Sequence, residues 1–242
     1  MTKEEKGEQV KRVICSDGSM TMLIDDMFLH PPKYGAHHSV DVHVTPIASL
    51  LSGNVRVLDI GFGTGWTVAA LIDECIRRNC TLDLIGIEKS KEVYEQRLTL
   101  HPPFDAHKYV RGEQREGLHV NVIIDDATNI ITTLGTFNII LLDGWNEHKT
   151  PELYSEDFLK KCYDALKQNG AITVNTGSWN VKDNLVKAGF KVETIAHKEY
   201  ESLVGGSEFS QQVLLTLLPP LQDDQLMETR ETGKNHSLLQ TR

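Results

Sequence analysis

Apolar runs of strand length alternate with longer segments of helical spacing over most of this chain. The first clear pair is the apolar run 55–60, VRVLDI, followed by 66–78, in which Ala69, Ile72 and Ile76 share one helical face. Strands that alternate with helices of about ten residues indicate βαβ units. We therefore predict an α/β fold, a doubly wound and mostly parallel sheet with helices on both faces. Further strands are predicted at 82–88, 118–125, 137–143, 170–176, 190–196 and 211–218, and further helices at 90–101, 127–134, 155–166 and 180–189.

The segment before residue 53 has a different character. Residues 1 to about 12 are charged, Asp17-Gly18 predicts a turn, and the apolar run after it predicts a small β element. A loop follows at 30–38, broken by two prolines, and 39–51 predicts a strand that turns into a helix. We divide the chain into 1–52 (N-terminal tail, β element and substrate-side loop), 53–218 (the α/β domain) and 219–242 (a polar tail that we expect to be disordered).

Composition excludes several classes of protein. Asp plus Glu number 34 against 25 Lys plus Arg, and a net charge of -9 argues against broad, non-specific binding of nucleic acid, although a local basic patch stays open. No run of about 18 apolar residues is present, and no apolar signal region follows the charged N-terminus. The four cysteines form no CxxC pair. We expect a cytoplasmic protein with reduced thiols.

Three histidines near the N-terminal loop raise the question of a metal site. His37, His38 and His43 have no cysteine or acid cluster at ligand spacing, and Asp41 alone does not supply one. We interpret them as surface or hydrogen-bonded side chains and predict no metal.

A glycine-rich turn follows the first strand, in the stretch Asp59-Ile60-Gly61-Phe62-Gly63-Thr64-Gly65. In a doubly wound sheet, ligands bind beyond the carboxyl ends of the strands, and glycines let a ligand approach the backbone. A dinucleotide fingerprint needs a third glycine where this chain has Trp66, and the Gly-Lys-Ser/Thr end of a P-loop is absent. The pattern D-x-G-x-G-x-G instead resembles the first motif of Rossmann-like S-adenosylmethionine-dependent methyltransferases.

Acids follow the next strands at the positions where such a cofactor needs acceptors. Glu88 ends the second strand, and its two carboxylate oxygens can accept both ribose hydroxyls. Asp125 and Asp126 follow the third strand, where an acid commonly lies near the adenine amino group. Asp126 is the better candidate by alignment, and Asp125 is a close second.

The fourth strand ends in Asp143-Gly144-Trp145. Asp143 is expected beside the sulfonium, and Trp145 offers a flat apolar face for stacking. Methyl transfer from a sulfonium is an in-line displacement, in which an enzyme mainly aligns donor and acceptor. An amine acceptor must be neutral to attack, and a carboxylate could hold it and take its proton.

The resemblance becomes specific in this segment. LLDGWNEHKTPELYSEDFL resembles a segment of the MnmC-like family of tRNA wobble-uridine methyltransferases, and DGSMTM, GFGTGW, IEKS and AGFKVE match in the same order, from about residue 16 to 215. The family implies a class I methyltransferase fold and transfer of a methyl group from S-adenosylmethionine to the aminomethyl group of a modified wobble uridine. The family often carries a flavin-dependent oxidase half, which this chain is too short to hold. An oxidative step would then belong to a separate upstream oxidoreductase.

The family roles fall on Gly61, Gly63, Gly65, Glu88, Asp126 and Asp143, with Lys149 and Pro151 in a lid-like segment. Trp145-Asn146-Glu147 replaces the family's Phe-Ala-Pro. Basic segments around Lys108 and Arg111, and around Lys182, Lys187 and Lys191, could meet tRNA phosphates. The predicted catalytic residues are Asp143 and Trp145; the cofactor-binding residues are Asp59, Gly61, Phe62, Gly63, Gly65, Glu88, Lys89, Asp125, Asp126 and Ala127; the substrate-binding residues are Tyr34, Lys149 and Tyr154.

Two other functions remain open. Spermidine synthases share the sheet, an N-terminal β-hairpin, an Asp after the fourth strand and a similar following helix, and they transfer an aminopropyl group from decarboxylated S-adenosylmethionine to a polyamine. Their loop usually reads Gly-Gly-x-Asp-Gly, whereas this chain has Thr64 at the acidic position. A cofactor-binding module without chemistry, such as an accessory subunit of an RNA enzyme, is the third possibility.

Overall fold

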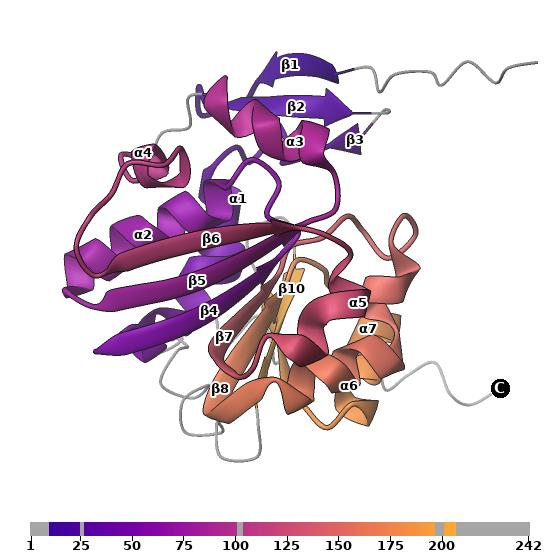
Figure 1. Ribbon diagram of the computed structural model, residues 1–242. Helices are drawn as coiled ribbons and strands as arrows, with labels where there is room; N and C mark the ends of the chain where they lie inside the picture. The colour runs from indigo at the N-terminus through magenta and orange to yellow at the C-terminus, as the bar shows by residue number, and fades with distance from the viewer. Residues whose placement is uncertain (1–9, 25–26, 101–103, 197–200, 207–242) are drawn as a thin grey trace, which may run out of the picture.

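The computed structural model describes residues 10–24, 27–100, 104–196 and 201–206, and its centre is a seven-stranded sheet (Figure 1). The first five strands in the sheet are parallel, and β10 is antiparallel to both of its neighbours. This arrangement confirms the predicted doubly wound, mostly parallel sheet. The strands in spatial order are β6 (Leu118–Ile124), β5 (Thr81–Glu88), β4 (Asn54–Ile60), β7 (Phe137–Leu142), β8 (Leu166–Val174), β10 (Glu201–Gly206) and β9 (Lys191–Ala196).

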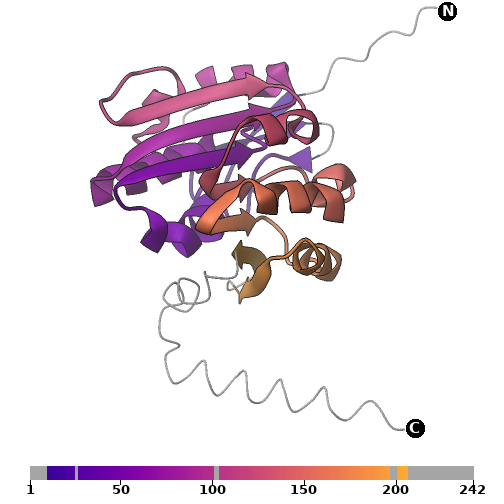
Figure 2. The ribbon, with the colours of Figure 1, turned by 60° about the horizontal axis from the view of Figure 1, so that its bottom comes forward.

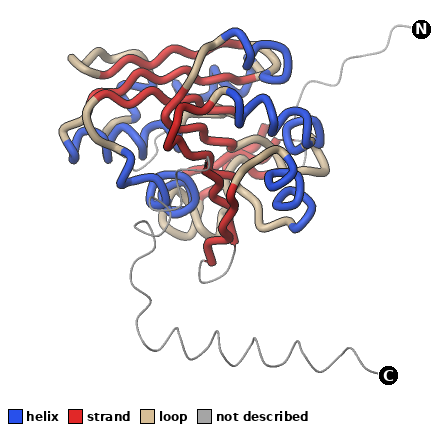
Figure 3. Tube along the Cα trace, turned by 90° about the horizontal axis from the view of Figure 1, so that it is seen from below, coloured by secondary structure: helices blue, strands red, loops and turns tan. Residues whose placement is uncertain are grey.

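Helices cover both faces of this sheet, as the views from below show (Figures 2 and 3). The central strands are apolar along their whole length because both faces are buried: Val57 packs into one core cluster and its neighbour Leu58 into the other. The first face carries α1 (His37–Ser39), η1 (Val40–Val44), η2 (Thr45–Leu50), α2 (Trp66–Arg78) and α4 (His107–Val110). The second carries α5 (Ala127–Ile130), η4 (Ile131–Thr133), η5 (Pro151–Tyr154), α6 (Glu156–Asp164) and α7 (Trp179–Lys187).

A small antiparallel sheet lies above the main one, next to α3 (Lys91–Glu95) and η3 (Gln96–Leu98) (Figure 1). Its strands are β1 (Val10–Ile14), β2 (Met20–Ile24) and β3 (Met27–Phe28), and the predicted turn at Asp17-Gly18 joins the first two. Met22 and Ile24 are buried against Val93 and Leu100, and Trp145 packs against the same cluster. The N-terminal strands are therefore fixed over the edge of the main sheet where β5 and β7 end.

Two of the sequence predictions differ from the structure, and others lie outside the described residues. The predicted strand at 39–44 is wrong, because η1 is π-helical: Val42, His43 and Val44 are consecutive and all buried, which an alternating strand facing one core would not allow. The predicted helix at 155–166 ends earlier, at Asp164, and β8 begins at Leu166 with a bulge opposite Phe137 and Ile139. The predicted strand 211–218, and most of the two predicted tails, lie outside the described residues.

The glycine turn between β4 and α2 brings two strand ends into contact. Gly61, Gly63 and Gly65 all have positive φ, of 91°, 56° and 78°. A Cβ atom on Gly61 would lie 2.5 Å from the carbonyl oxygen of Asp143, at the end of the neighbouring β7. Two features therefore require a glycine as residue 61: its left-handed backbone conformation and the close approach of the end of β7.

Gly61→Ala is expected to destabilise the fold by about 2–5 kcal/mol, because about 1–2 kcal/mol of left-handed strain adds to about 1–3 kcal/mol of overpacking against backbone. Gly53→Ala is the matched control, since Gly53 has a similar φ of 60° and nothing within 4 Å of the added Cβ. Urea unfolding of both variants measures the difference, and equal losses would show that the contact with Asp143 is unimportant.

Candidate active site

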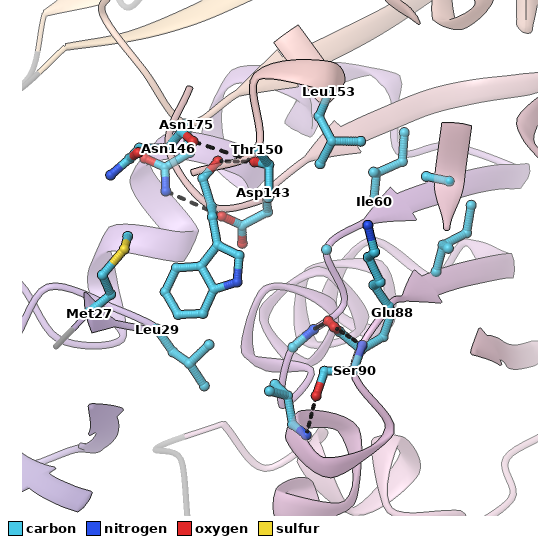
Figure 4. A pocket seen from close by; sticks show the side chains of 18 of the residues that line it. Met27, Leu29, Ile60, Glu88, Ser90, Asp143, Asn146, Thr150, Leu153 and Asn175 are labelled. Carbon is cyan, nitrogen blue, oxygen red and sulfur yellow. Dashed lines mark hydrogen bonds between the residues drawn. The ribbon is translucent and has the colours of Figure 1, made fainter. Parts of the chain in front are cut away.

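A cavity of about 490 Å³ lies at the carboxyl ends of β4, β5, β6 and β7 (Figure 4). The N-terminal strands close its other side with Met27, Phe28, Leu29 and Pro31. Among the described residues, no helix is long and apolar enough to cross a membrane, and no cluster of three His, Cys, Asp or Glu side chains could hold a metal ion. The predicted site residues on the cavity wall are Gly61, Gly63, Glu88, Lys89, Asp125, Asp126, Ala127, Asp143 and Trp145.

Glu88 ties the glycine loop to the start of α3. Its Oε2 accepts a hydrogen bond from the Gly63 N–H at 2.7 Å, and its Oε1 accepts one from the Ser90 N–H at 2.9 Å. Ser90 in turn caps α3, because its hydroxyl accepts a hydrogen bond from the Val93 N–H. The carboxylate is thus held at a fixed place on the cavity wall by backbone groups from two loops.

The two acids after β6 have different surroundings. Asp126 caps α5, where its Oδ1 accepts hydrogen bonds from the Thr128 N–H and hydroxyl, and its Oδ2 lies 2.8 Å from Lys89 Nζ. The hydrogen bond from Lys89, with those from Thr128, lowers the pKa of Asp126 to about 2. Asp125 is exposed and accepts one hydrogen bond through Oδ1, from the Asp126 N–H.

Asp143 is contacted by side chains from three parts of the chain, and its own side chain is only 12% exposed. Its Oδ2 accepts a hydrogen bond from the Thr67 hydroxyl at 2.6 Å, and its Oδ1 accepts one from Asn175 Nδ2 at 3.2 Å. Burial raises the pKa of Asp143, but the charges of His43 and His30 and the hydrogen bonds outweigh it, so that the net shift of the pKa is downward. Asp143 is therefore an ionised carboxylate at the cavity wall.

The loop after Asp143 is fixed by hydrogen bonds to the Trp145 carbonyl oxygen. The Tyr154 hydroxyl donates to it at 2.7 Å, and the Thr150 hydroxyl donates to it at 3.0 Å. Lys149 Nζ lies 4.5 Å from the centre of the Trp145 ring, on the same loop. Trp145 and Leu29 pack against the same small hydrophobic cluster, and Met27 and Leu29 lie on the cavity wall (Figure 4). These contacts hold the aromatic face beside the Asp143 carboxylate.

Other predicted site residues lie behind the cavity wall. Asp59 is buried in β4, and its carboxyl has no hydrogen-bond partner within the described chain. Burial, followed by the charges of Asp143 and Glu88, raises the pKa of Asp59 well above its ordinary value. Phe62 and Gly65 pack in the core against one another. The predicted contact of these three residues with a cofactor stays a prediction.

The predicted substrate residues are also set back from the wall. The Tyr34 ring stacks on the His38 ring at 5.8 Å, Tyr154 is buried beneath the loop after Asp143, and Lys149 covers Trp145. Their predicted contact with substrate likewise stays a prediction.

Sequence reasoning did not assign His30, His43, Thr67 or Asn175 to the site. His43 is wholly buried, and its Nδ1 lies 2.7 Å from the Thr173 hydroxyl, which agrees with the hydrogen-bonded interpretation. Its Nε2 lies 3.2 Å from Asp143 Oδ1. The available signal was His43 itself, a polar residue between two valines in VDVHV. A histidine buried among apolar residues needs a hydrogen-bond partner.

Comparison with known proteins gives a consistent result for the sequence. Residues 88–200, which include Glu88, Asp126 and Asp143, match the family model of an S-adenosyl-L-methionine-dependent methyltransferase. An uncharacterized protein of Methanocaldococcus jannaschii, MJ0670, is 26% identical over 79% of this chain and 57% of its own length. The tRNA 5-methylaminomethyl-2-thiouridine biosynthesis bifunctional protein MnmC of Leptospira borgpetersenii is 24% identical over 57% of this chain. The chain spans only 24% of the length of that MnmC.

Solved structures share the fold. The crystal structure of MNMC2 from Aquifex aeolicus is 22% identical, with a TM-score of 0.75 over 94% of this chain and 77% of that one. Spermidine synthase from Thermotoga maritima is 16% identical, with a TM-score of 0.63 over 91% of this chain and 75% of its own. The family match, the MnmC relatives and the fold agree with the motifs read from the sequence. Residues 88–200 thus resemble S-adenosyl-L-methionine-dependent methyltransferases, and the chain is similar to the MnmC proteins among its relatives.

Proposed function

We propose that this chain methylates the aminomethyl group of a modified wobble uridine in tRNA, with S-adenosylmethionine bound in the cavity at the sheet edge. The observation that carries the proposal is the ionised carboxylate of Asp143, held at the wall of a cavity whose other polar groups suit an adenosyl cofactor. The MnmC relatives, which are tRNA 5-methylaminomethyl-2-thiouridine biosynthesis proteins, supply the substrate class.

The residues on the wall fit this cofactor. Gly61 presents bare backbone, because a side chain there would meet the Asp143 carbonyl oxygen. Glu88 stands where the second strand ends and offers two acceptor oxygens for ribose hydroxyls. The buried Asp59 carboxyl, without a partner in the described chain, is available to a polar group close to the glycine loop.

The surroundings of the two acids after β6 change their ranking as adenine ligands. Asp126 is committed to the cap of α5 and to Lys89, whereas Asp125 is exposed on the cavity wall with one hydrogen bond through Oδ1. We therefore assign the acceptor for the adenine amino group to Asp125 and a supporting position to Asp126. This reverses the order given by sequence alignment.

Residues of this chain bind and orient the acceptor amine. When bound, S-adenosylmethionine supplies an electrophilic methyl group on a sulfonium. Asp143 holds an N–H of the acceptor amine and keeps its lone pair directed along the line of attack. The new C–N bond would form as the S–C bond breaks, and the methylated ammonium, paired with the ionised Asp143, would then release its extra proton to solvent. Trp145 supplies a flat apolar face beside this amine, and the bonds from Tyr154 and Thr150 keep its loop in place.

The macromolecular substrate needs a positive surface on an acidic protein. Lys108 and Arg111 lie on and just after α4, and the Lys108 ammonium is 5.2 Å from the Tyr109 ring. Such a cluster could contact phosphates while the rest of the surface discourages non-specific binding. We propose that an oxidoreductase supplies the aminomethyl group upstream, and that both steps take place in the cytoplasm.

Aminopropyl transfer to a polyamine is the second candidate. The spermidine synthase likeness extends over 91% of this chain, so that it includes more than the sheet. A carboxylate after β7 would serve a polyamine as well as an aminomethyl uridine. The choice depends on the cofactor and acceptor that the protein uses.

Glu88→Ala is expected to weaken binding of S-adenosylmethionine by about 1.5–3 kcal/mol, the scale of hydrogen bonds to a charged group. Calorimetric titration measures the change. Glu95→Ala is the matched control, since Glu95 is an exposed acid on α3 that pairs with Lys91. Equal affinity in the Glu88 variant and the wild type would remove Glu88 from the cofactor site.

Asp143→Asn is expected to keep cofactor binding and to lower kcat by at least about 100-fold, the scale of losing one electrostatic group at a reacting centre. The pKa of Asp143 is lowered, so its carboxylate persists as the pH falls and is lost only below that depressed pKa. The wild-type rate should therefore fall at acidic pH through protonation of the acceptor amine. Full activity in the variant would contradict the role of Asp143.

The wild-type protein is expected to transfer labelled methyl from S-adenosylmethionine to bulk tRNA that contains aminomethylated wobble uridine, and not to tRNA that lacks it. Nucleoside chromatography after digestion detects the product. Transfer from decarboxylated S-adenosylmethionine to putrescine, with no label in tRNA, would replace methyl transfer by aminopropyl transfer.

A further inference from the structure

His43 is a buried polar residue between the sheet and the cavity. It lies on η1, which packs over β8 on the first face of the sheet, and its side chain has no exposed surface. One ring nitrogen faces β7 and the other faces β8: Nε2 is 3.2 Å from Asp143 Oδ1, and Nδ1 is 2.7 Å from the Thr173 hydroxyl. His43 therefore joins the acid of the cavity wall to the core of the sheet.

Two hydrogen bonds and the ion-pair contact with His43 surround Asp143, whose carboxylate has roughly four acceptor positions. Oδ1 receives Asn175 Nδ2 and faces His43 Nε2, while Oδ2 receives the Thr67 hydroxyl. Within the described chain, the remaining position is on Oδ2. An acceptor amine in the cavity would meet Asp143 through that oxygen.

The proton on Nε2 of His43 follows from its partner. A carboxylate accepts only, so Nε2 has to carry the proton that faces Asp143. Nδ1 lies next to the Thr173 hydroxyl, which can donate to Nδ1 in the neutral ring or accept from it in the imidazolium. The arrangement places an N–H donor behind Asp143 and fixes the ring that carries it.

We propose that His43 is a positioning residue for the transfer reaction: its Nε2–H holds the Asp143 carboxylate ionised and turned so that Oδ2 faces the acceptor amine. This inference rests on the proposed function for its effect on turnover, but its effect on Asp143 itself does not depend on the acceptor. Loss of the donor leaves a buried carboxylate with less compensation, which favours its protonated form.

Several other titratable groups face this pair. His30, from the loop after β3, stacks on Trp66 at 4.5 Å, and burial lowers its pKa to about 4 against the opposing charge of Asp143. Asp59 on β4 and Tyr154 on η5 have raised pKa values, caused first by burial and then by the charge of Asp143. These groups titrate together with Asp143, so the test has to follow the Asp143 carboxyl directly.

Two amide substitutions distinguish the effect of the Nε2–H donor from the effect of the volume that the His43 side chain fills. In His43→Gln, the side-chain nitrogen is as many bonds from Cα as imidazole Nε2, so the donor to Asp143 is kept. In His43→Asn, the amide reaches only as far as Nδ1, so the link to Thr173 can persist while the donor to Asp143 is lost. His37→Asn is the control, because His37 is an exposed histidine on α1.

The first measurement is the NMR titration of the Asp143 side-chain carboxyl carbon, assigned by its loss in Asp143→Asn. We expect His43→Asn to raise the pKa of Asp143 by at least about one unit, the effect of removing a favourable neighbour. His43→Gln and His37→Asn should leave it close to the wild type. The same titration in all four proteins would overturn the inference, whatever the acceptor is.

The second measurement is kcat for tRNA methylation across pH. His43→Asn should lose about 10- to 100-fold, as when a residue that orients a functional ligand is removed, while its acid limb, which the acceptor amine sets, should stay where the wild type has it. His43→Gln should retain most of the rate, with cofactor affinity unchanged in both. Equal rates in the two variants would mean that His43 acts only by filling space. Absence of tRNA methylation by the wild type would refute the proposed function and leave the NMR result standing.

Discussion

The site depends on keeping one carboxylate charged at the edge of an apolar core. The strand that carries Asp143 is buried on both faces, and desolvation alone would favour the neutral acid. Thr67 from α2, Asn175 after β8 and His43 from η1 surround the two oxygens, so three separate elements contribute to one charge. The position of these elements, rather than the identity of any one loop, determines the chemical state of the acid.

The sheet could be predicted from the sequence because its central strands are buried on both faces. Runs such as VRVLDI and FNIILLD are continuous apolar segments, and the helix over 66–78 has its predicted bounds. The glycine loop and Glu88 could be placed because parallel strands bring their carboxyl ends to one edge. Local sequence rules predict where a residue lies wherever a single strand, helix or turn determines its place in the fold.

The parts that could not be predicted depend on contacts between distant residues. Val40, Val42 and Val44 alternate like a strand, but packing against β8 and α2 winds them into a helix and turns His43 inward. Nothing next to His43 in the chain indicates Asp143 or Thr173, which lie 100 and 130 residues later in the sequence. The ranking of Asp125 and Asp126 likewise depends on the Lys89 side chain, whose position only the folded chain reveals.

The small N-terminal sheet limits how a nucleotide of a nucleic acid could enter the cavity. Met27, Phe28, Leu29 and Pro31 form one wall of the cavity opposite the sheet edge, so the reacting groups meet in a cleft between two walls and not on a flat surface. A base stacked inside a helical stem cannot reach such a space, since its neighbours above and below are too wide to accompany it. Under the proposed function, the nucleotide would have to leave its stack and enter alone, as bases do in enzymes that extrude their target. An unpaired wobble base in a loop has little stacking to lose when it leaves its neighbours. The wall formed by β3 and the loop after it would therefore exclude paired bases and admit unpaired ones, before any hydrogen bond to the base is made.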